Sequence, residues 1–280
     1  MPGTKKQKTK SRSESPIGIF DSGIGGLTVA HAIHKILPQE SIVYFGDTAH
    51  LPYGEKSPDS IKYYGLRIAE FLLGHGCKTI VIACNTASSI AFEAIKKHVG
   101  NRATVISVIE PVVNRVAAQV SDQKIGVIGT KATIKSDVYA KKINLLNPML
   151  QVASLATPLL APMIEEGFFN NKISKTIIHS YLDKARLKNI KTIILACTHY
   201  PLIKGEIEDF YKGKVKIIDS AQIVAEAVFN HLADQGLLNT TAKPENRFFI
   251  SDFTPSFAES TKIFFKGKLN LEHYPLWENE

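Results

Sequence analysis

Short runs of Ile and Val alternate with amphipathic stretches along almost the whole chain of 280 residues, and this alternation constrains the fold more than any other feature. Continuous short apolar runs are typical of strands buried on both faces, as in parallel sheets. They predict strands at 17–20, 41–46, 79–83, 104–108, 124–128, 150–155, 192–196, 215–218 and 247–251. The amphipathic stretches predict helices at 26–37, 57–74, 88–98, 136–145, 172–188 and 221–235. This order predicts an α/β fold with doubly wound parallel sheets.

An internal repeat indicates that the chain contains two related halves. The segment KTIVIAC at 78–84 matches KTIILAC at 191–197 in five of seven positions, and IGIFDS at 17–22 is weakly similar to IGVIGT at 125–130. Two pseudo-symmetric α/β domains are the simplest explanation, although two buried strands can resemble each other by chance. We expect one domain at 16–109 and a second at 110–219, with 220–280 returning to the first.

The repeat places a cysteine at the end of each matching strand. Cys84 and Cys197 each end an apolar run and begin a polar turn, and ligands of open parallel sheets lie outside the carboxyl ends of the strands. Related halves would place the two thiols on opposite sides of one site. One thiol could then remove a proton from a carbon while the other delivers a proton to its opposite face. Alternatively, both cysteines are small apolar residues that fill strand ends, which is the role we expect for Cys77.

Two further turns are predicted to contribute to the same site. The glycines in DSGIGG at 21–26 do not complete a dinucleotide pattern, because Thr28 stands where its last Gly is needed. We therefore expect them to permit a tight turn and a close backbone approach, leaving Asp21 and Ser22 at the ligand. Asp21 could instead serve only as a helix cap. The turn at 47–54 makes Tyr53 available as a lid or hydrogen-bond donor.

Composition excludes several other classes of protein. Three cysteines without paired spacing and without clustered histidines predict neither a disulfide framework nor a metal site. No apolar run approaches the ~18 residues that span a membrane, and no apolar stretch follows the basic start as in a secretory signal, so we expect a cytoplasmic protein. Half of the net charge of +8 lies in residues 1–15, which we expect to be a disordered tail. Contact of that tail with nucleic acid is the weaker alternative to simple solvation.

Five motifs taken together resemble glutamate racemase, a member of the family of aspartate and glutamate racemases that work without pyridoxal phosphate. They are FDSGIGGLTV at 20–29, DTAHLPYG at 47–54, ACNTAS at 83–88, GVIGTKAT at 126–133 and ACTHYP at 196–201. The resemblance runs in order from about residue 16 to 235. It implies interconversion of L- and D-glutamate without cofactor or metal, supplying D-glutamate for peptidoglycan synthesis. A homodimer is the expected assembly.

The resemblance also implies roles for individual residues. Cys84 and Cys197 would be the catalytic acid/bases, with Cys84 serving the D-enantiomer and Cys197 the L-enantiomer. Asp21 would assist Cys84, while His199 and Glu165 would assist Cys197. The expected substrate contacts are Asp21, Ser22, Tyr53, Gly54, Asn85, Thr86, Thr130, Thr198 and His199.

Proton abstraction poses a chemical problem, because a free thiol has a pKa near ~8.5, far below that of an amino-acid α-proton. We expect hydrogen bonds to the α-carboxylate in a dry site to stabilise the carbanion-like transition state. We also expect a helix terminus or His199 to bring the thiol pKa values toward neutral. An aspartate racemase, or a racemase-like interaction protein that uses the basic tail, remains the alternative.

Overall fold

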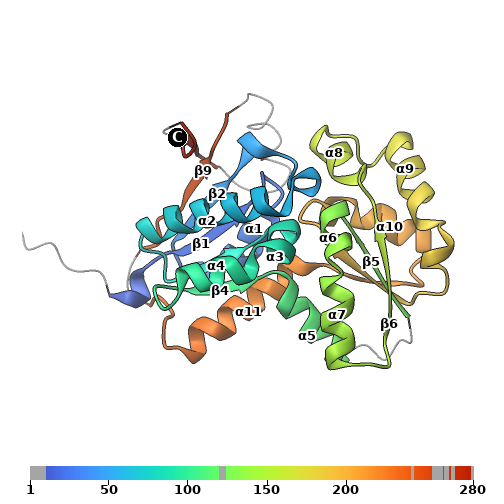
Figure 1. Cartoon of the computed structure of the whole chain (residues 1–280), viewed down its shortest axis with the longest axis horizontal. Coiled ribbons are helices and arrows are strands. Elements are labelled where there is room, and N and C mark those ends of the chain that lie inside the picture. Colours follow the sequence, from blue (N-terminus) through green and yellow to red (C-terminus); the bar gives the residue numbers. More distant parts are fainter. Residues whose placement is uncertain are drawn as a thin grey trace, which may run out of the picture.

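The chain forms two parallel β-sheets, and the strands of the second lie in sequence between those of the first (Figure 1). The computed structural model describes residues 11–119, 124–240, 243–253, 261, 265 and 269–278. The first sheet has the strand order β10-β9-β2-β1-β3-β4, and the second has the order β6-β5-β7-β8. All pairings between neighbouring strands are parallel. The predicted fold of two parallel-sheet domains is therefore confirmed.

The strands lie where the apolar runs predict them, within two residues at either end. The first sheet contains β1 (Ile17–Asp21), β2 (Ile42–Gly46), β3 (Thr79–Ile82), β4 (Thr104–Ser107), β9 (Arg247–Ile250) and β10 (Leu271–His273). The second contains β5 (Lys124–Gly129), β6 (Gln151–Ala156), β7 (Thr192–Ala196) and β8 (Lys216–Ile218). Strands β1, β2, β3 and β7 are buried along their whole length, which explains their continuous apolar sequences. Strand β10 was not predicted, because its three residues carry no such run.

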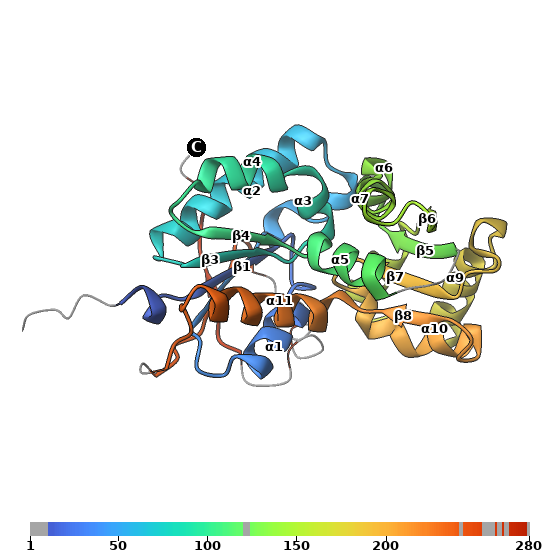
Figure 2. The ribbon, with the colours of Figure 1, turned by 90° about the horizontal axis from the view of Figure 1, so that it is seen from below.

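Helices cover both faces of the first sheet (Figure 2). On one face α1 (Leu27–Ile36) packs against α11 (Ser220–Asp234). The opposite face carries α2 (Pro58–Gly74), α3 (Asn85–Ile90) and α4 (Phe92–Val99). Because α11 packs on α1 and β9 pairs with β2, the chain after residue 219 returns to the first sheet, as expected.

The helices associated with the second sheet follow the sequence less closely. They are α5 (Ile109–Gln119), α6 (Lys131–Ser136), α7 (Val138–Leu146), α8 (Leu160–Glu165), α9 (Lys172–Leu182) and α10 (Lys204–Tyr211). In place of the predicted helix 136–145 there are two helices, α6, which begins earlier, and α7. They are separated at Asp137, whose left-handed φ of 59° ends α6. The predicted helix 88–98 is likewise two helices, α3 and α4, that meet at Ala91. The predicted helix 172–188 is too long, because α9 ends at Leu182.

The predicted disordered tail is also too long. Residues Arg12–Glu14 form a 3-10 helix, and the carbonyl of Ser13 accepts a hydrogen bond of 2.6 Å from the ammonium of Lys78. Lys78 is buried and also pairs with Glu40 at 2.6 Å, so its charge requires acceptors there. Residues 11–15 therefore belong to the folded body, while 1–10 lie outside the described residues. Within the described part of the chain, no helix is long and apolar enough to cross a membrane.

Candidate active site

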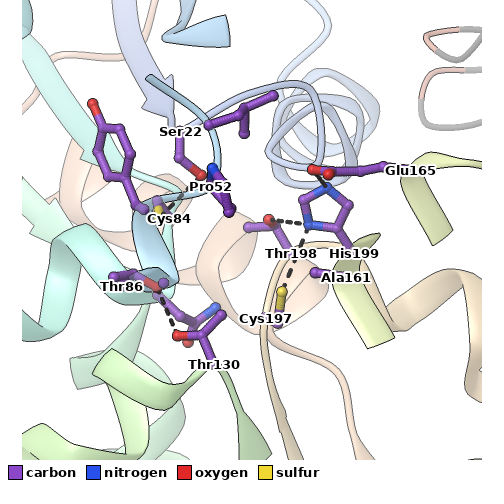
Figure 3. A pocket seen from close by; sticks show the side chains of 14 residues that line it. Ser22, Pro52, Cys84, Thr86, Thr130, Ala161, Glu165, Cys197, Thr198 and His199 are labelled. Carbon is purple, nitrogen blue, oxygen red and sulfur yellow. Dashed lines mark hydrogen bonds and ion pairs between the residues drawn. The ribbon is translucent and has the colours of Figure 1, made fainter. Parts of the chain in front are cut away.

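A pocket lies where polar turns at the carboxyl ends of both sheets meet, as parallel-sheet topology predicts. Residues from both halves of the chain line it: Ser22, Leu51, Pro52, Tyr53, Gly54, Cys84, Asn85, Thr86, Thr130, Ala161, Glu165, Cys197, Thr198 and His199. Figure 3 shows Cys84 and Cys197 on opposite sides of this pocket. The space that the centre of a water molecule can occupy is only ≈ 30 Å³. The pocket is therefore narrow.

Cys84 lies at the N-terminus of a helix, as expected. It is the N-cap residue of α3, and its Sγ accepts a hydrogen bond of 3.4 Å from the N–H of Ala87. The thiol in turn donates to Ser22 Oγ at 3.6 Å. Burial and the negative charge of Asp21 nevertheless raise the pKa of Cys84 to about 12, and the hydrogen bonds with Ala87 and Ser22 only partly oppose this. The pKa of Cys84 is therefore shifted upward, opposite to the expected shift toward neutral.

Cys197 has a different environment, because no helix begins directly after it. Its Sγ lies 3.6 Å from Nδ1 of His199, whose Nε2 lies 2.9 Å from Oε1 of Glu165 (Figure 3). Burial alone lowers the pKa of His199, but contacts with Cys197 and Glu165 outweigh it and raise the pKa well above 6.5. With its raised pKa, His199 places an imidazolium beside the sulfur of Cys197. The two thiols thus have opposite surroundings: Cys84 has a carboxylate nearby and Cys197 an imidazolium.

Asp21 lies behind the pocket and does not line it. Its side chain is completely buried and accepts hydrogen bonds from the N–H groups of Gly23 and Gly26, at 3.1 and 3.0 Å. The hydroxyl of Thr198 also donates to it, at 3.4 Å. Burial raises the pKa of Asp21, although His199 and the backbone donors oppose this. A direct contact between Asp21 and the substrate stays a prediction, since Asp21 is not among the residues that line the pocket.

The glycines of this turn allow the close approach that was predicted. A Cβ at Gly25 would lie 2.5 Å from His199 Cε1, and one at Gly26 would lie 2.5 Å from Cβ of Asp21. Any side chain at Gly25 would push His199 away from Cys197. The turn therefore packs tightly against the opposite half of the site.

Asn85 presents a buried donor to the pocket. Its side chain is 2% exposed, and its Oδ1 accepts a hydrogen bond of 2.7 Å from the hydroxyl of Tyr139. That bond fixes the orientation of the amide, and Nδ2 has no hydrogen-bond partner among the described residues. A buried unsatisfied N–H is costly, and a bound carboxylate would satisfy it. Nearby, Thr86 Oγ1 lies 2.9 Å from Thr130 Oγ1, so hydroxyls of both halves meet at the same wall.

Tyr53 lines the pocket, but its hydroxyl is already engaged. It donates a hydrogen bond of 2.6 Å to Oδ2 of Asp47, which is completely buried. Burial, together with Asp47, raises the pKa of Tyr53 well above 10. The predicted role of Tyr53 as a hydrogen-bond donor to a ligand is therefore not available in this structure, and its ring and backbone form part of the wall instead.

The remaining predictions concern residues outside the pocket. Cys77 is buried away from it, and burial raises its pKa to about 12, consistent with a structural role. Among the described residues, no group of three or more His, Cys, Asp or Glu side chains could hold a metal ion. Tyr139 and Asp47 act on pocket residues but were not predicted, because their roles depend on contacts distant in sequence. Ala161 was missed along with its helix α8, whose six residues carry no clear periodicity.

Comparisons with known proteins agree with this arrangement. The model of the Asp/Glu/Hydantoin racemase family matches residues 26–228. A glutamate racemase of Geobacter metallireducens is 44% identical over 90% of this chain and 93% of its own length. The crystal structure of glutamate racemase from Francisella tularensis in complex with D-glutamate is 39% identical, with a TM-score of 0.89 over 95% of this chain and 99% of that one. An aspartate racemase of Picrophilus torridus is 18% identical at a TM-score of 0.58, a likeness of fold alone. The chain therefore belongs to the Asp/Glu/Hydantoin racemase family, and its close relatives there are glutamate racemases.

Proposed function

We propose that this chain interconverts L- and D-glutamate by proton transfer between the α-carbon and two thiols. The observation that carries the proposal is the position of Cys84 and Cys197 on opposite sides of one narrow pocket. Racemisation needs one base and one acid on opposite faces of the carbon, and each thiol can be either. The identity of 44% to a glutamate racemase supports glutamate over aspartate as substrate.

In the direction from L to D, the thiolate of Cys197 removes the α-proton and becomes a thiol. The C–H electron pair stays on the α-carbon and is delocalised into the α-carboxylate. The thiol of Cys84 then delivers its proton to the opposite face and becomes a thiolate. The reverse direction exchanges the two roles, so each turnover leaves the pair in the state that the opposite reaction requires. Protonated Cys84 and the imidazolium beside Cys197 suit the start of this direction.

The carbanion-like transition state needs donors around the α-carboxylate. We assign this task to the Nδ2 of Asn85 and to the hydroxyls of Ser22, Thr86, Thr130 and Thr198, which line the pocket. Such donors are strong in a site that excludes water, and they cost little reorganisation when held in place beforehand. Asp21, His199 and Glu165 act on the thiols: Asp21 by its charge near Cys84, and the other two through Cys197. No step requires a metal ion or an organic cofactor.

The decisive experiment is a chiral assay of the purified protein with L-glutamate and, separately, with L-aspartate. We expect D-glutamate to accumulate to a racemic mixture, in the presence of EDTA and without added pyridoxal phosphate. Preferential racemisation of aspartate would mean that aspartate, and not glutamate, is the substrate. No racemisation of either amino acid, or activity only after addition of a metal ion or pyridoxal phosphate, would refute the proposed mechanism.

We further propose that the protein is a cytoplasmic homodimer whose D-glutamate enters peptidoglycan precursors. A reducing compartment suits the three free cysteines, two of which must stay reduced for the reaction. Large apolar side chains at Leu145 and Met149 are 82% and 83% exposed at the end of α7 and just beyond it, and a second copy could cover them. Light scattering of the purified protein measures the assembly, and a monomer at micromolar concentration would contradict this part.

A further inference from the structure

The loop of residues 47–54, called the pocket loop here, has two sides with different contacts. One side faces the pocket through Leu51, Pro52, Tyr53 and Gly54. On its other side lie segments distant in sequence, after β9 and after β10. Thr48 Oγ1 donates to the carbonyl of Asp252 at 2.6 Å and accepts from the N–H of Asp252 at 2.8 Å. The pocket wall is therefore supported from behind by the part of the chain that returns to the first sheet.

Asp47 is the centre of this support. Its carboxylate is completely buried and accepts hydrogen bonds from side chains on three separate segments. Tyr53 donates to Oδ2 at 2.6 Å, while Ser251 and the indole Nε1 of Trp277 donate to Oδ1 at 2.8 and 2.9 Å. His50 Nδ1 lies 3.0 Å from Oδ2 and closes the set. A buried carboxylate with this many donors holds each of them firmly, because losing one donor leaves charge unsatisfied.

Trp277 also packs against the outer side of the pocket loop. Its ring centroid lies 4.7 Å from that of His50 in an edge-on arrangement and 5.4 Å from that of Tyr64. His50 in turn stacks on Tyr64 at 3.9 Å. The indole thus contacts the loop through an apolar face and a polar N–H together, a combination that only Trp provides among apolar side chains.

The position of the loop matters for the pocket. A Cβ at Gly54 would lie 2.9 Å from Cβ of Thr130, so the loop already touches the opposite half of the site. Movement inward is blocked, and outward movement enlarges the narrow pocket. Any group that holds the loop from behind therefore helps to set the size and shape of the pocket.

We propose that Trp277 is a positioning residue for the substrate: through Asp47 and Tyr53 it holds the pocket loop against the site. Only the kinetic part of this inference rests on the proposed function. Trp277 does not line the pocket, so its loss should weaken substrate binding without removing an acid or base.

The variant Trp277→Phe tests this, since it keeps an aromatic ring and removes the N–H donor. We expect the KM for glutamate to rise about three- to tenfold, the effect of losing one hydrogen bond to a charged group, with kcat within about twofold. Amides of residues 48–54 should exchange with deuterium faster than in the unsubstituted protein, without any ligand. The matched control is Tyr274→Phe, which removes a hydroxyl from the same segment; Tyr274 packs against Phe71 and Phe249. It should leave the KM unchanged.

An unchanged KM in Trp277→Phe overturns the proposal even if the loop exchanges faster, because the indole would then be merely structural. An equal rise of KM in Tyr274→Phe also overturns it, because the effect would then come from a general loosening of the segment. If the unsubstituted protein does not racemise glutamate, the proposed function fails and so does the kinetic part of this inference, and the exchange rates then decide whether Trp277 holds the pocket loop. If Trp277→Phe does not fold, the fluorescence of the native protein decides, since Trp277 is its single tryptophan. A saturable change with D-glutamate then supports the proposal, and no change overturns it.

Discussion

At the scale of single residues, the two thiols differ more than their matching sequence motifs suggest. Cys84 has the carboxylate of Asp21 behind it, while Cys197 has the His199 ring beside it. Replacing either cysteine by serine should lower racemisation by about a thousandfold or more, because a serine hydroxyl is a far weaker acid/base near neutral pH. Each variant should still exchange the α-proton of one enantiomer in D₂O, and the two variants should choose opposite enantiomers. Proton NMR of the α-position measures both reactions.

Cys77→Ser is the control for this pair, since Cys77 is buried outside the pocket. Activity near that of the unsubstituted protein is expected for it. Racemisation at full rate in Cys84→Ser or Cys197→Ser, or exchange of the same enantiomer by both, would contradict the model of two opposed thiols.

The pH dependence depends on His199. Its pKa is raised by Cys197 and Glu165 despite burial, so the imidazolium persists at neutral pH and loses its proton only at more alkaline pH. If the imidazolium supports the Cys197 thiolate, activity falls as pH rises through the raised pKa. Glu165→Gln removes one cause of the raised pKa, so the alkaline limb of kcat/KM should move to lower pH by about one unit. The neighbouring, exposed Glu166 gives the control Glu166→Gln. A profile unchanged in Glu165→Gln would exclude this role of the His199–Glu165 pair.

Sequence was a good guide to the residues of the site and a poorer guide to their environment. Ser22, Asn85 and Thr198 were expected at the pocket and line it. The burial of Asp21 behind the glycine turn and the bond from Tyr53 to Asp47 were not predicted. Motif spacing indicates which residues follow a strand, but the direction of a side chain depends on the partners that the tertiary fold supplies.

At the scale of secondary-structure elements, the pocket depends on helix starts from both sheets. The first residue of α3, Asn85, is held by Tyr139 of α7, and Thr86 meets Thr130 before α6. Tyr139→Phe should raise the KM for glutamate about five- to tenfold, since the Asn85 amide loses the partner that orients it. Phe keeps the ring in its buried position, so the melting temperature should change little. Steady-state kinetics with both enantiomers measure the effect. An unchanged KM for both would mean that the bond from Tyr139 does not orient Asn85 for substrate binding.

The strands were predictable and several helices were not, for a physical reason. A strand buried on both faces, such as β7, is apolar at most positions and so stands out in the sequence. Helix α8 has only six residues, and α6 is separated from α7 by the left-handed Asp137. Such short helices are held by packing rather than by their own periodicity.

At the scale of the whole molecule, the site lies between two sheets that the chain connects at two places. We propose the domain boundaries at residues 109 and 219, because α5 begins at Ile109 and α11 begins after Asp219. Few covalent connections allow the two halves to rotate relative to one another. Three contacts between the two halves then characterise the closed state. They are Thr86 with Thr130, Thr28 with the Thr198 carbonyl at 3.2 Å, and the exposed pair Lys131–Glu55.

The pocket between the two halves is small, and we expect it to widen when glutamate enters. The halves can separate, or the pocket loop can move. We therefore expect glutamate to stabilise the closed state and to slow deuterium exchange in the loops around Tyr53 and Thr198. Exchange in the strand β7, which is buried and paired on both sides with β5 and β8, serves as the internal control and should not respond. Mass spectrometry of peptic peptides with and without saturating D-glutamate measures both. Equal exchange in the two loops with and without ligand would mean that the site is rigid, and substrate would then have to enter by local side-chain movement alone.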